Sequence, residues 1–122
     1  MAKAKIAHAD GAAAVEAYLQ GDDAREKRAT ASRYLLQLLE EKAPGNTLEV
    51  RVPPFGAAQV VQGPRHTRGT PPNVVEMDAA TWVALATGSL AWADALAAGR
   101  VAASGTRADL GPYLPLAWRV AP

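Results

Sequence analysis

Two glycines, Gly88 and Gly99, divide residues 74–105, VVEMDAATWVALATGSLAWADALAAGRVAASG, into short segments that end where a helix would stop. Glycine adopts the left-handed conformation at a helix C-terminus without the steric cost of a Cβ atom. The stretch therefore predicts a strand, a helix, a tight stop, a second short helix, another stop and a final strand. No other part of the sequence carries as many mutually consistent signals.

The first predicted strand of this stretch contains Val74, Val75 and Met77, interrupted by Glu76. Asp78 follows at the position of a helix N-cap, where a carboxylate accepts hydrogen bonds from free backbone N–H groups and suits the positive end of the helix dipole. The predicted elements are a strand at 74–77, helices at 79–87 and 91–98, and a strand at 100–105.

The N-terminal residues predict a helical arm over 1–21. An alanine-rich run at 10–20 places Val15, Tyr18 and Leu19 at helical spacing, and Gly21 ends it. Two interpretations remain open for this arm: a short helix packed on the domain, or a mobile extension.

A longer amphipathic helix is predicted after the arm, with Asp22 and Asp23 as capping residues and Lys42 near its end. Its apolar residues recur at spacings of three and four: Ala31, Tyr34, Leu35, Leu38 and Leu39. Such a helix most simply covers one face of a sheet. We therefore expect residues 22–122 to form a single domain.

Three further extended segments are predicted. Leu48–Val52 alternates apolar and charged residues, as a half-buried strand does. A second strand is expected at 57–62. At 113–120 apolar residues alternate with others, and Pro115 would confine that segment to an edge or a non-paired position.

Composition excludes several functional classes. The formal net charge is +1, which provides no long-range attraction for nucleic acid. The absence of cysteine excludes disulfides, thiolate nucleophiles and Cys-ligated metals. No run approaches the ~20 apolar residues of a transmembrane helix, and the N-terminus lacks a signal-peptide pattern. We expect a cytoplasmic protein with no cofactor, no metal, no nucleic-acid partner and no transmembrane segment.

The polar loop at 64–73, PRHTRGTPPN, is the one candidate anion site of the sequence. Arg65, His66 and Arg68 lie close together there and could hold a carboxylate or phosphate. The alternative is an exposed loop whose arginines serve solubility.

Evidence for an enzyme is weak. The two histidines, His8 and His66, have no recognisable nucleophile beside them. An enzyme that uses His66 with Glu76 or Asp78 is the last of the hypotheses, because Asp78 is better explained as a helix cap.

The segment MDAATWVALATGSLAWADALAAGRVAASG resembles the signature region of the sterol carrier protein 2 family, in which a strand leads into two short helices that each end at a glycine. The residues that carry the resemblance are Met77, Asp78, Trp82, Leu85, Gly88, Leu90, Ala95, Gly99, Val101 and Gly105. The stretch RGTPPNVVEMDAATW is similar to the small actinobacterial branch, the bacterial sterol carrier orthologues.

The resemblance implies an α+β fold with a mainly antiparallel, five-stranded sheet covered by helices. It also implies a non-catalytic protein that binds lipid in an apolar cavity between sheet and helices. The eukaryotic carriers close that cavity with a C-terminal helix, whereas this chain ends in a proline-containing extended segment. A fatty-acyl or other apolar small molecule is therefore favoured over a sterol.

The small residues at 91–105 and the pair Trp82 and Trp92 motivate a ligand site in this region. The candidate lining residues are Val75, Met77, Trp82, Leu85, Leu96 and Val101, with Arg65, His66 and Arg68 near a head group. For each apolar residue the competing interpretation is ordinary core.

The alternative function is an accessory interaction module without ligand, in which the N-terminal arm or the segment 113–120 docks an enzyme or a second copy as a homodimer. Accessory domains of this fold also occur beside enzymes, including the thiol-dependent isomerase group of actinobacteria.

Overall fold

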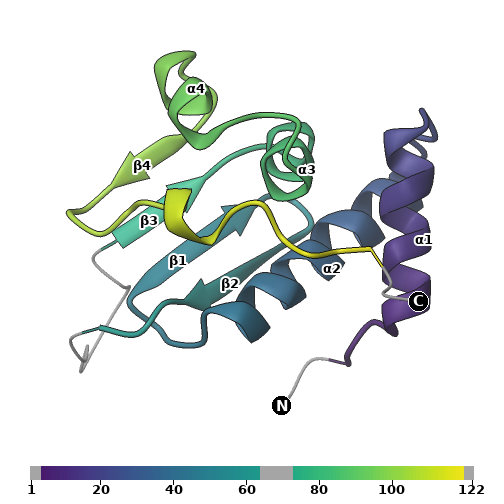
Figure 1. Cartoon of the computed structure of the whole chain (residues 1–122), viewed down its shortest axis with the longest axis horizontal. Helices are drawn as coiled ribbons and strands as arrows, with labels where there is room; N and C mark the ends of the chain where they lie inside the picture. Colours follow the sequence, from purple (N-terminus) through teal and green to yellow (C-terminus); the bar gives the residue numbers. More distant parts are fainter. Residues whose placement is uncertain (1–3, 64–72, 120–122) are drawn as a thin grey trace.

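The computed structural model describes residues 4–63 and 73–119 of the chain (Figure 1). Four α-helices, four strands and one short 3₁₀ helix follow one another over these residues. In chain order they are α1 (His8–Leu19), α2 (Arg25–Lys42), β1 (Leu48–Val52), β2 (Gly56–Val60), β3 (Asn73–Glu76), α3 (Ala79–Thr87), α4 (Trp92–Ala97), β4 (Ala102–Ser104) and η1 (Gly111–Tyr113).

The strands form one open sheet in the order β2-β1-β3-β4. The β1–β2 and β3–β4 pairs are antiparallel and the central β1–β3 pair is parallel, so the sheet is mainly antiparallel, as expected. The expectation of five strands is wrong for the described residues, which form four. The described part of the extended segment predicted at 113–120, residues 113–119, contributes no strand, because it packs on a helix instead of pairing with the sheet.

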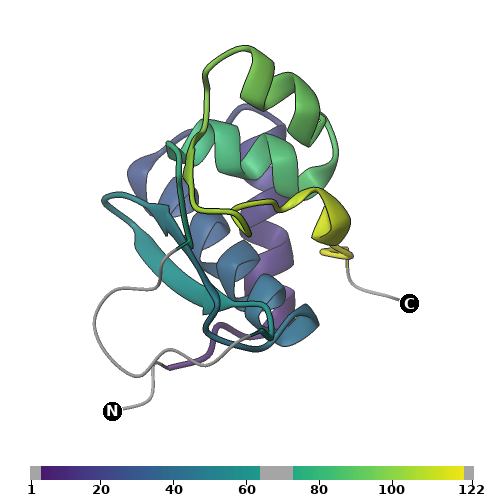
Figure 2. The same cartoon turned by 90° about the vertical axis from the view of Figure 1, so that its left-hand side faces the viewer.

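The C-terminal segment crosses the helices (Figure 1, Figure 2). The Leu116 backbone N–H donates to the Ala86 carbonyl of α3 at 2.8 Å, and the Leu116 and Trp118 side chains are buried. Arg119 reaches Glu16 of α1 at 2.8 Å. Pro115 has no N–H to donate to a sheet. Through the contacts of Leu116 and Arg119, the segment instead joins α3 to α1.

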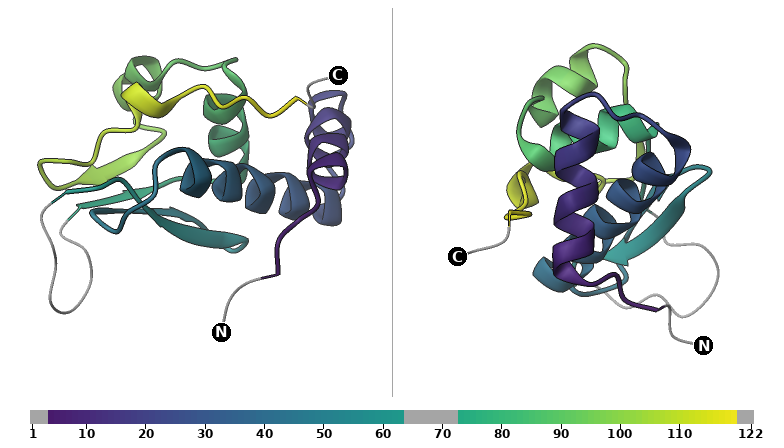
Figure 3. Two further views of the ribbon diagram at one scale, coloured as in Figure 1. Left: turned by 60° about the horizontal axis from the view of Figure 1, so that its bottom comes forward. Right: turned by 90° about the vertical axis from the view of Figure 1, so that its right-hand side faces the viewer.

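The helices lie on one side of the sheet (Figure 3). Alternation along β1 explains this arrangement, because Leu48, Val50 and Val52 are fully buried whereas Glu49 and Arg51 lie on the other face. The inward residues pack beneath α2 and α3, which are tied together by the Trp82 indole N–H donating to the Ser32 carbonyl at 3.1 Å.

Helix α1 lies across α2 (Figure 3). Val15 of α1 is fully buried in the common core, and Gly11 faces the ring of Tyr34, where a Cβ atom would overlap the ring. The N-terminal helix is thus packed on the domain. A separate arm ending at residue 21 stays a prediction.

The central stretch folds largely as predicted. Helix α3 has the expected bounds, and the Asp78 carboxylate caps it by accepting from the Thr81 backbone N–H at 2.8 Å. Gly88 and Gly99 end the two helices with φ angles of 90° and 70°. The strand expected at 100–105 is shorter, because only 102–104 pair with β3.

Two boundaries predicted for the N-terminal half are wrong. Helix α2 begins at Arg25 after Ala24, and Asp22 closes a turn before the helix by accepting from the Ala24 N–H at 3.3 Å. The strand expected at 57–62 occupies Gly56–Val60, because Val61 has a φ of 69° and donates its N–H to the Ala43 carbonyl.

Candidate ligand groove over helix α2

A groove of about 790 Å³ lies along α2, and we call it the α2 groove. Its walls are residues 4–6, here called the strap, and the turn that leads into β2. The lining residues are Ala4, Lys5, Ile6, Thr30, Arg33, Leu36, Gln37, Glu40, Glu41, Phe55, Gly56 and Ala57. They combine apolar side chains with a few charged and amide groups, as small-molecule sites usually do.

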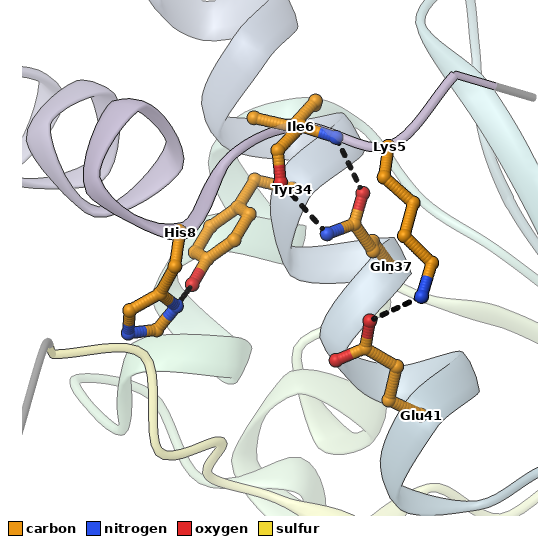
Figure 4. A network of polar contacts seen from close by, with 6 residues as sticks. All are labelled: Lys5, Ile6, His8, Tyr34, Gln37 and Glu41. Atoms are coloured by element: carbon orange, nitrogen blue, oxygen red, sulfur yellow. Dashed lines mark hydrogen bonds and ion pairs between the residues drawn. The ribbon is translucent and has the colours of Figure 1, made fainter.

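Polar contacts with α2 hold the strap in place (Figure 4). Gln37 donates to the Ile6 carbonyl at 3.0 Å and accepts from the Ile6 N–H at 2.9 Å. Lys5 forms an ion pair with Glu41 at 3.8 Å. These contacts join residues far apart in the sequence, so the wall exists only in the folded chain.

A contact between His8 and Tyr34 fixes the point where the strap enters α1 (Figure 4). The Tyr34 hydroxyl is hydrogen-bonded to His8 Nδ1, and the two rings are tilted by 57°. Burial raises the pKa of the Tyr34 phenol, and the nearby Glu41 carboxylate raises that pKa further. Tyr34 therefore stays protonated, which suits its place in the core.

Two arginines of α2 hold the opposite wall at Phe55. Arg33 donates from Nε to the Phe55 carbonyl at 2.7 Å, and the Arg25 guanidinium lies 5.3 Å from the centre of the Phe55 ring. Beside Phe55, Gly56 leaves room in the groove. A Cβ atom there would meet Leu36 at 3.5 Å and Arg33 at 3.9 Å, which are ordinary contacts.

Charge is distributed unevenly along the α2 groove. Arg33 lies near one end and Glu40 about two turns further along the helix. Within residues 4–63 and 73–119, neither side chain forms an ion pair, whereas Lys5 is paired with Glu41. An occupant would meet a positive end and a negative end joined by apolar side chains.

The structure places the sequence-predicted apolar site residues elsewhere. Val75, Met77, Trp82, Leu85 and Val101 are buried in the core between the sheet and the helices. Leu96 of α4 is 42% exposed. None of the six lines the α2 groove, so their contact with a ligand stays a prediction.

The predicted head-group residues Arg65, His66 and Arg68 lie outside the described residues. Among the two remaining groups of the enzyme hypothesis, Asp78 is engaged as the cap of α3. The hydrogen bond from the Thr81 backbone lowers the pKa of Asp78, with smaller help from the Thr81 side chain and Arg100. Over residues 4–63 and 73–119, no three His, Asp or Glu side chains group as metal ligands would.

The residues of the α2 groove were missed in the sequence, although one signal was present. Thr30, Arg33, Gln37 and Glu41 recur at spacings of three and four along one flank of α2. Polar residues at this spacing are also typical of the solvated side of an amphipathic helix. The spacing does not show that the strap and Phe55 lie on either side of this flank and form the walls of the groove.

The fold and the groove define a small α+β domain with an open four-stranded sheet, helices on one face and a ligand-sized hollow on the surface. The model of the family described as "Bacterial SCP ortholog" matches residues 24–116. The chain therefore belongs to this family, as the resemblance of the central stretch indicated. The match includes α2, the sheet and both central helices, whereas the strap and α1 precede it.

Comparison with curated proteins found no match. No helix in the described part of the chain is both long enough and apolar enough to span a membrane.

Proposed function

We propose that this protein is a non-catalytic carrier or binding protein for an apolar, fatty-acyl-type ligand, and that the α2 groove is the binding site. Membership of the bacterial sterol carrier ortholog family supports a carrier rather than an enzyme. The observation that carries the proposal is the groove itself. Its volume of about 790 Å³ falls within the usual range of small-molecule sites, and Ile6, Leu36 and Phe55 supply apolar surface.

The shape of the groove favours an elongated ligand. Its lining residues on α2 extend from Thr30 to Glu41, a span of about 16 Å along the helix axis at about 1.5 Å per residue. A single acyl chain can lie along such a surface and contact both walls.

The interior between α3 and the sheet is the second proposed place for the ligand, because five of the six apolar residues predicted from the sequence are buried there. Trp82 and Val75 are fully buried and Leu85 nearly so. A ligand would have to displace close-packed side chains, which costs more than filling an existing hollow. The α2 groove is therefore the preferred site.

An accessory interaction module is the alternative function. No helix of residues 4–63 and 73–119 covers the sheet face that carries Glu49, Arg51 and Glu76 (Figure 3), and such a face can receive a partner or a second copy. Binding of a partner without any binding of an acyl chain would favour this alternative.

The test is a titration with the fluorescent fatty acid 11-(dansylamino)undecanoic acid, which brightens in apolar surroundings. Wild-type protein should bind this probe at micromolar concentration. Gly56→Leu should abolish or strongly weaken binding, because the new side chain would fill the space between Leu36 and Arg33. Gln59→Leu is the matched control, since it adds the same side chain to the exposed face of β2.

Three results would count against parts of the proposal. Absence of probe binding to the wild type contradicts the carrier function. Equal affinity for wild type and a folded Gly56→Leu variant contradicts the α2 groove. Loss of binding in Leu96→Asn, with Gly56→Leu unaffected, would favour the residues predicted near α4.

A further inference from the structure

Arg33 is held at the edge of the α2 groove in a defined orientation. Its Nε–H donates to the Phe55 carbonyl at 2.7 Å, and that contact joins α2 to the turn before β2. The Nε edge of the guanidinium is thereby engaged, whereas the two terminal nitrogens are left for other acceptors. A guanidinium fixed in this way presents two parallel N–H donors, the geometry that binds carboxylate and phosphate oxygens.

The charge of Arg33 is not balanced by the described protein. The three ion pairs of residues 4–63 and 73–119 join Lys5 to Glu41, Arg51 to Glu49 and Arg119 to Glu16. Of the two cations that line the α2 groove, Lys5 is therefore neutralised by a carboxylate and Arg33 is not. Arg25 adds a second guanidinium at the same end, over the Phe55 ring.

The acidic end of the groove gives a ligand its direction. Glu40 lies seven positions beyond Arg33 on α2, which corresponds to about 10 Å along the helix axis. An anionic head group would be repelled at the Glu40 end and attracted at the Arg33 end. Leu36 lies between the two charges and contributes apolar surface to the groove.

We propose that the ligand of the α2 groove is an amphiphile with an anionic head group, a carboxylate or a phosphate, and that Arg33 binds this head group while the apolar chain extends over Leu36. The proposal rests on the proposed carrier function. It adds which charge the ligand carries, which residue selects it and which way the ligand lies. Carboxylate and phosphate head groups both carry at least two negatively charged oxygens. These oxygens can accept hydrogen bonds from the paired N–H groups of Arg33.

The test uses displacement of the bound dansyl probe by three ligands of equal chain length: laurate, dodecyl phosphate and dodecanol. Arg33→Gln should weaken binding of the anionic ligand about five- to tenfold and binding of dodecanol less than twofold, because only the charged ligand loses a charge-assisted contact. Arg33→Lys should retain part of the anionic affinity, since it keeps the charge but not the paired donors. Comparison of laurate with dodecyl phosphate distinguishes a carboxylate ligand from a phosphate ligand.

Lys27→Gln is the matched control, because it removes one positive charge from the same helix without touching the groove. Its affinity for laurate should equal that of the wild type. If Lys27→Gln weakens laurate binding as much as Arg33→Gln does, the general positive charge of α2, and not Arg33, attracts the anion. That result would overturn the proposal. Circular dichroism melts of all variants establish that each one is folded.

The outcomes separate this inference from the function on which it rests. If Arg33→Gln weakens laurate, dodecyl phosphate and dodecanol equally, the head-group role is overturned although the carrier function stands. If none of the ligands displaces the probe from the wild type and none binds to it directly, the carrier function fails and the inference fails with it. A loss confined to the anionic ligands confirms both.

Discussion

The backbone of Ile6 and the side chain of Gln37 exchange two hydrogen bonds, at 2.9 and 3.0 Å, across 31 positions of the chain. The amide of Gln37 thereby acts as a backbone substitute, pairing with the N–H and C=O of one residue as a neighbouring strand would. This double contact places the strap along α2 and gives the α2 groove its second wall (Figure 4).

Removal of this pairing should loosen the strap while leaving the domain folded. We expect Gln37→Ala to lower the free energy of unfolding by about 1–2 kcal/mol, since two partly buried hydrogen bonds are lost. The Ile6 amide should exchange its hydrogen faster, and hydrogen–deuterium exchange followed by NMR measures this directly. Gln20→Ala, which removes an exposed glutamine bonded to Glu16, is the control. Unchanged protection of Ile6 in Gln37→Ala would show that other contacts hold the strap.

The crossing of α1 and α2 should depend on the missing side chain at Gly11. A methyl group there would overlap the buried ring of Tyr34, and overpacking of this kind typically costs about 1–3 kcal/mol. Urea unfolding should therefore show a clear loss of stability in Gly11→Ala. Gly56→Ala should be neutral or stabilising, because its methyl group meets only ordinary contacts. A Gly11→Ala variant as stable as wild type would mean that α1 does not pack on α2 as described.

The two helix-ending glycines should differ in how well they tolerate a side chain. Both have positive φ angles, so Val at Gly88 or Gly99 incurs the left-handed strain of about 1–2 kcal/mol. A Cβ at Gly88 would also come within 3.3 Å of Pro115, whereas no atom in the described part of the chain lies within 4 Å of one at Gly99. Thermal unfolding should thus rank Gly88→Val below Gly99→Val. The reverse ranking would argue against the contact between the C-terminal segment and α3.

The cap of α3 should make stability depend on pH in the acidic range. The pKa of Asp78 is lowered in the folded protein by its hydrogen bonds to Thr81, so its contribution is fully present above the unfolded pKa of about 4 and is lost as pH falls through the folded value. Asp78→Ala should cost about 1 kcal/mol at neutral pH. The difference from wild type should shrink below about pH 4, as urea unfolding at several pH values can measure. A difference that stays constant down to pH 2 would rule out a contribution from the ionised carboxylate.

Much of the fold follows from local signals. Leu48–Val52 and Ala79–Thr87 have the bounds expected from alternation and from the Asp78 cap. These elements are predictable because the residues that define them are adjacent in the sequence. The end of β2 cannot be predicted in this way, because Val61 turns out of the strand and donates its N–H to the Ala43 carbonyl. That partner comes from the distant end of α2.

The candidate site depends almost entirely on long-range contacts. Gln37 is an unremarkable polar position on a helix until Ile6 is beside it, and Arg33 gains an orientation only from the Phe55 carbonyl. The sequence instead points to apolar residues around α3, where the resemblance to sterol carriers is strongest. All of them except the exposed Leu96 form core in the structure, and their part in ligand binding stays a prediction.

Occupation of the α2 groove by an acyl ligand can be measured residue by residue in a ¹H–¹⁵N NMR titration of the labelled protein with laurate. We expect the largest amide shifts on residues that line the groove, namely Ile6, Arg33, Leu36 and Gly56, and no shifts at Val75, Leu85 and Val101. Shifts concentrated on Val75, Leu85 and Val101, or no shifts at millimolar laurate, would contradict it.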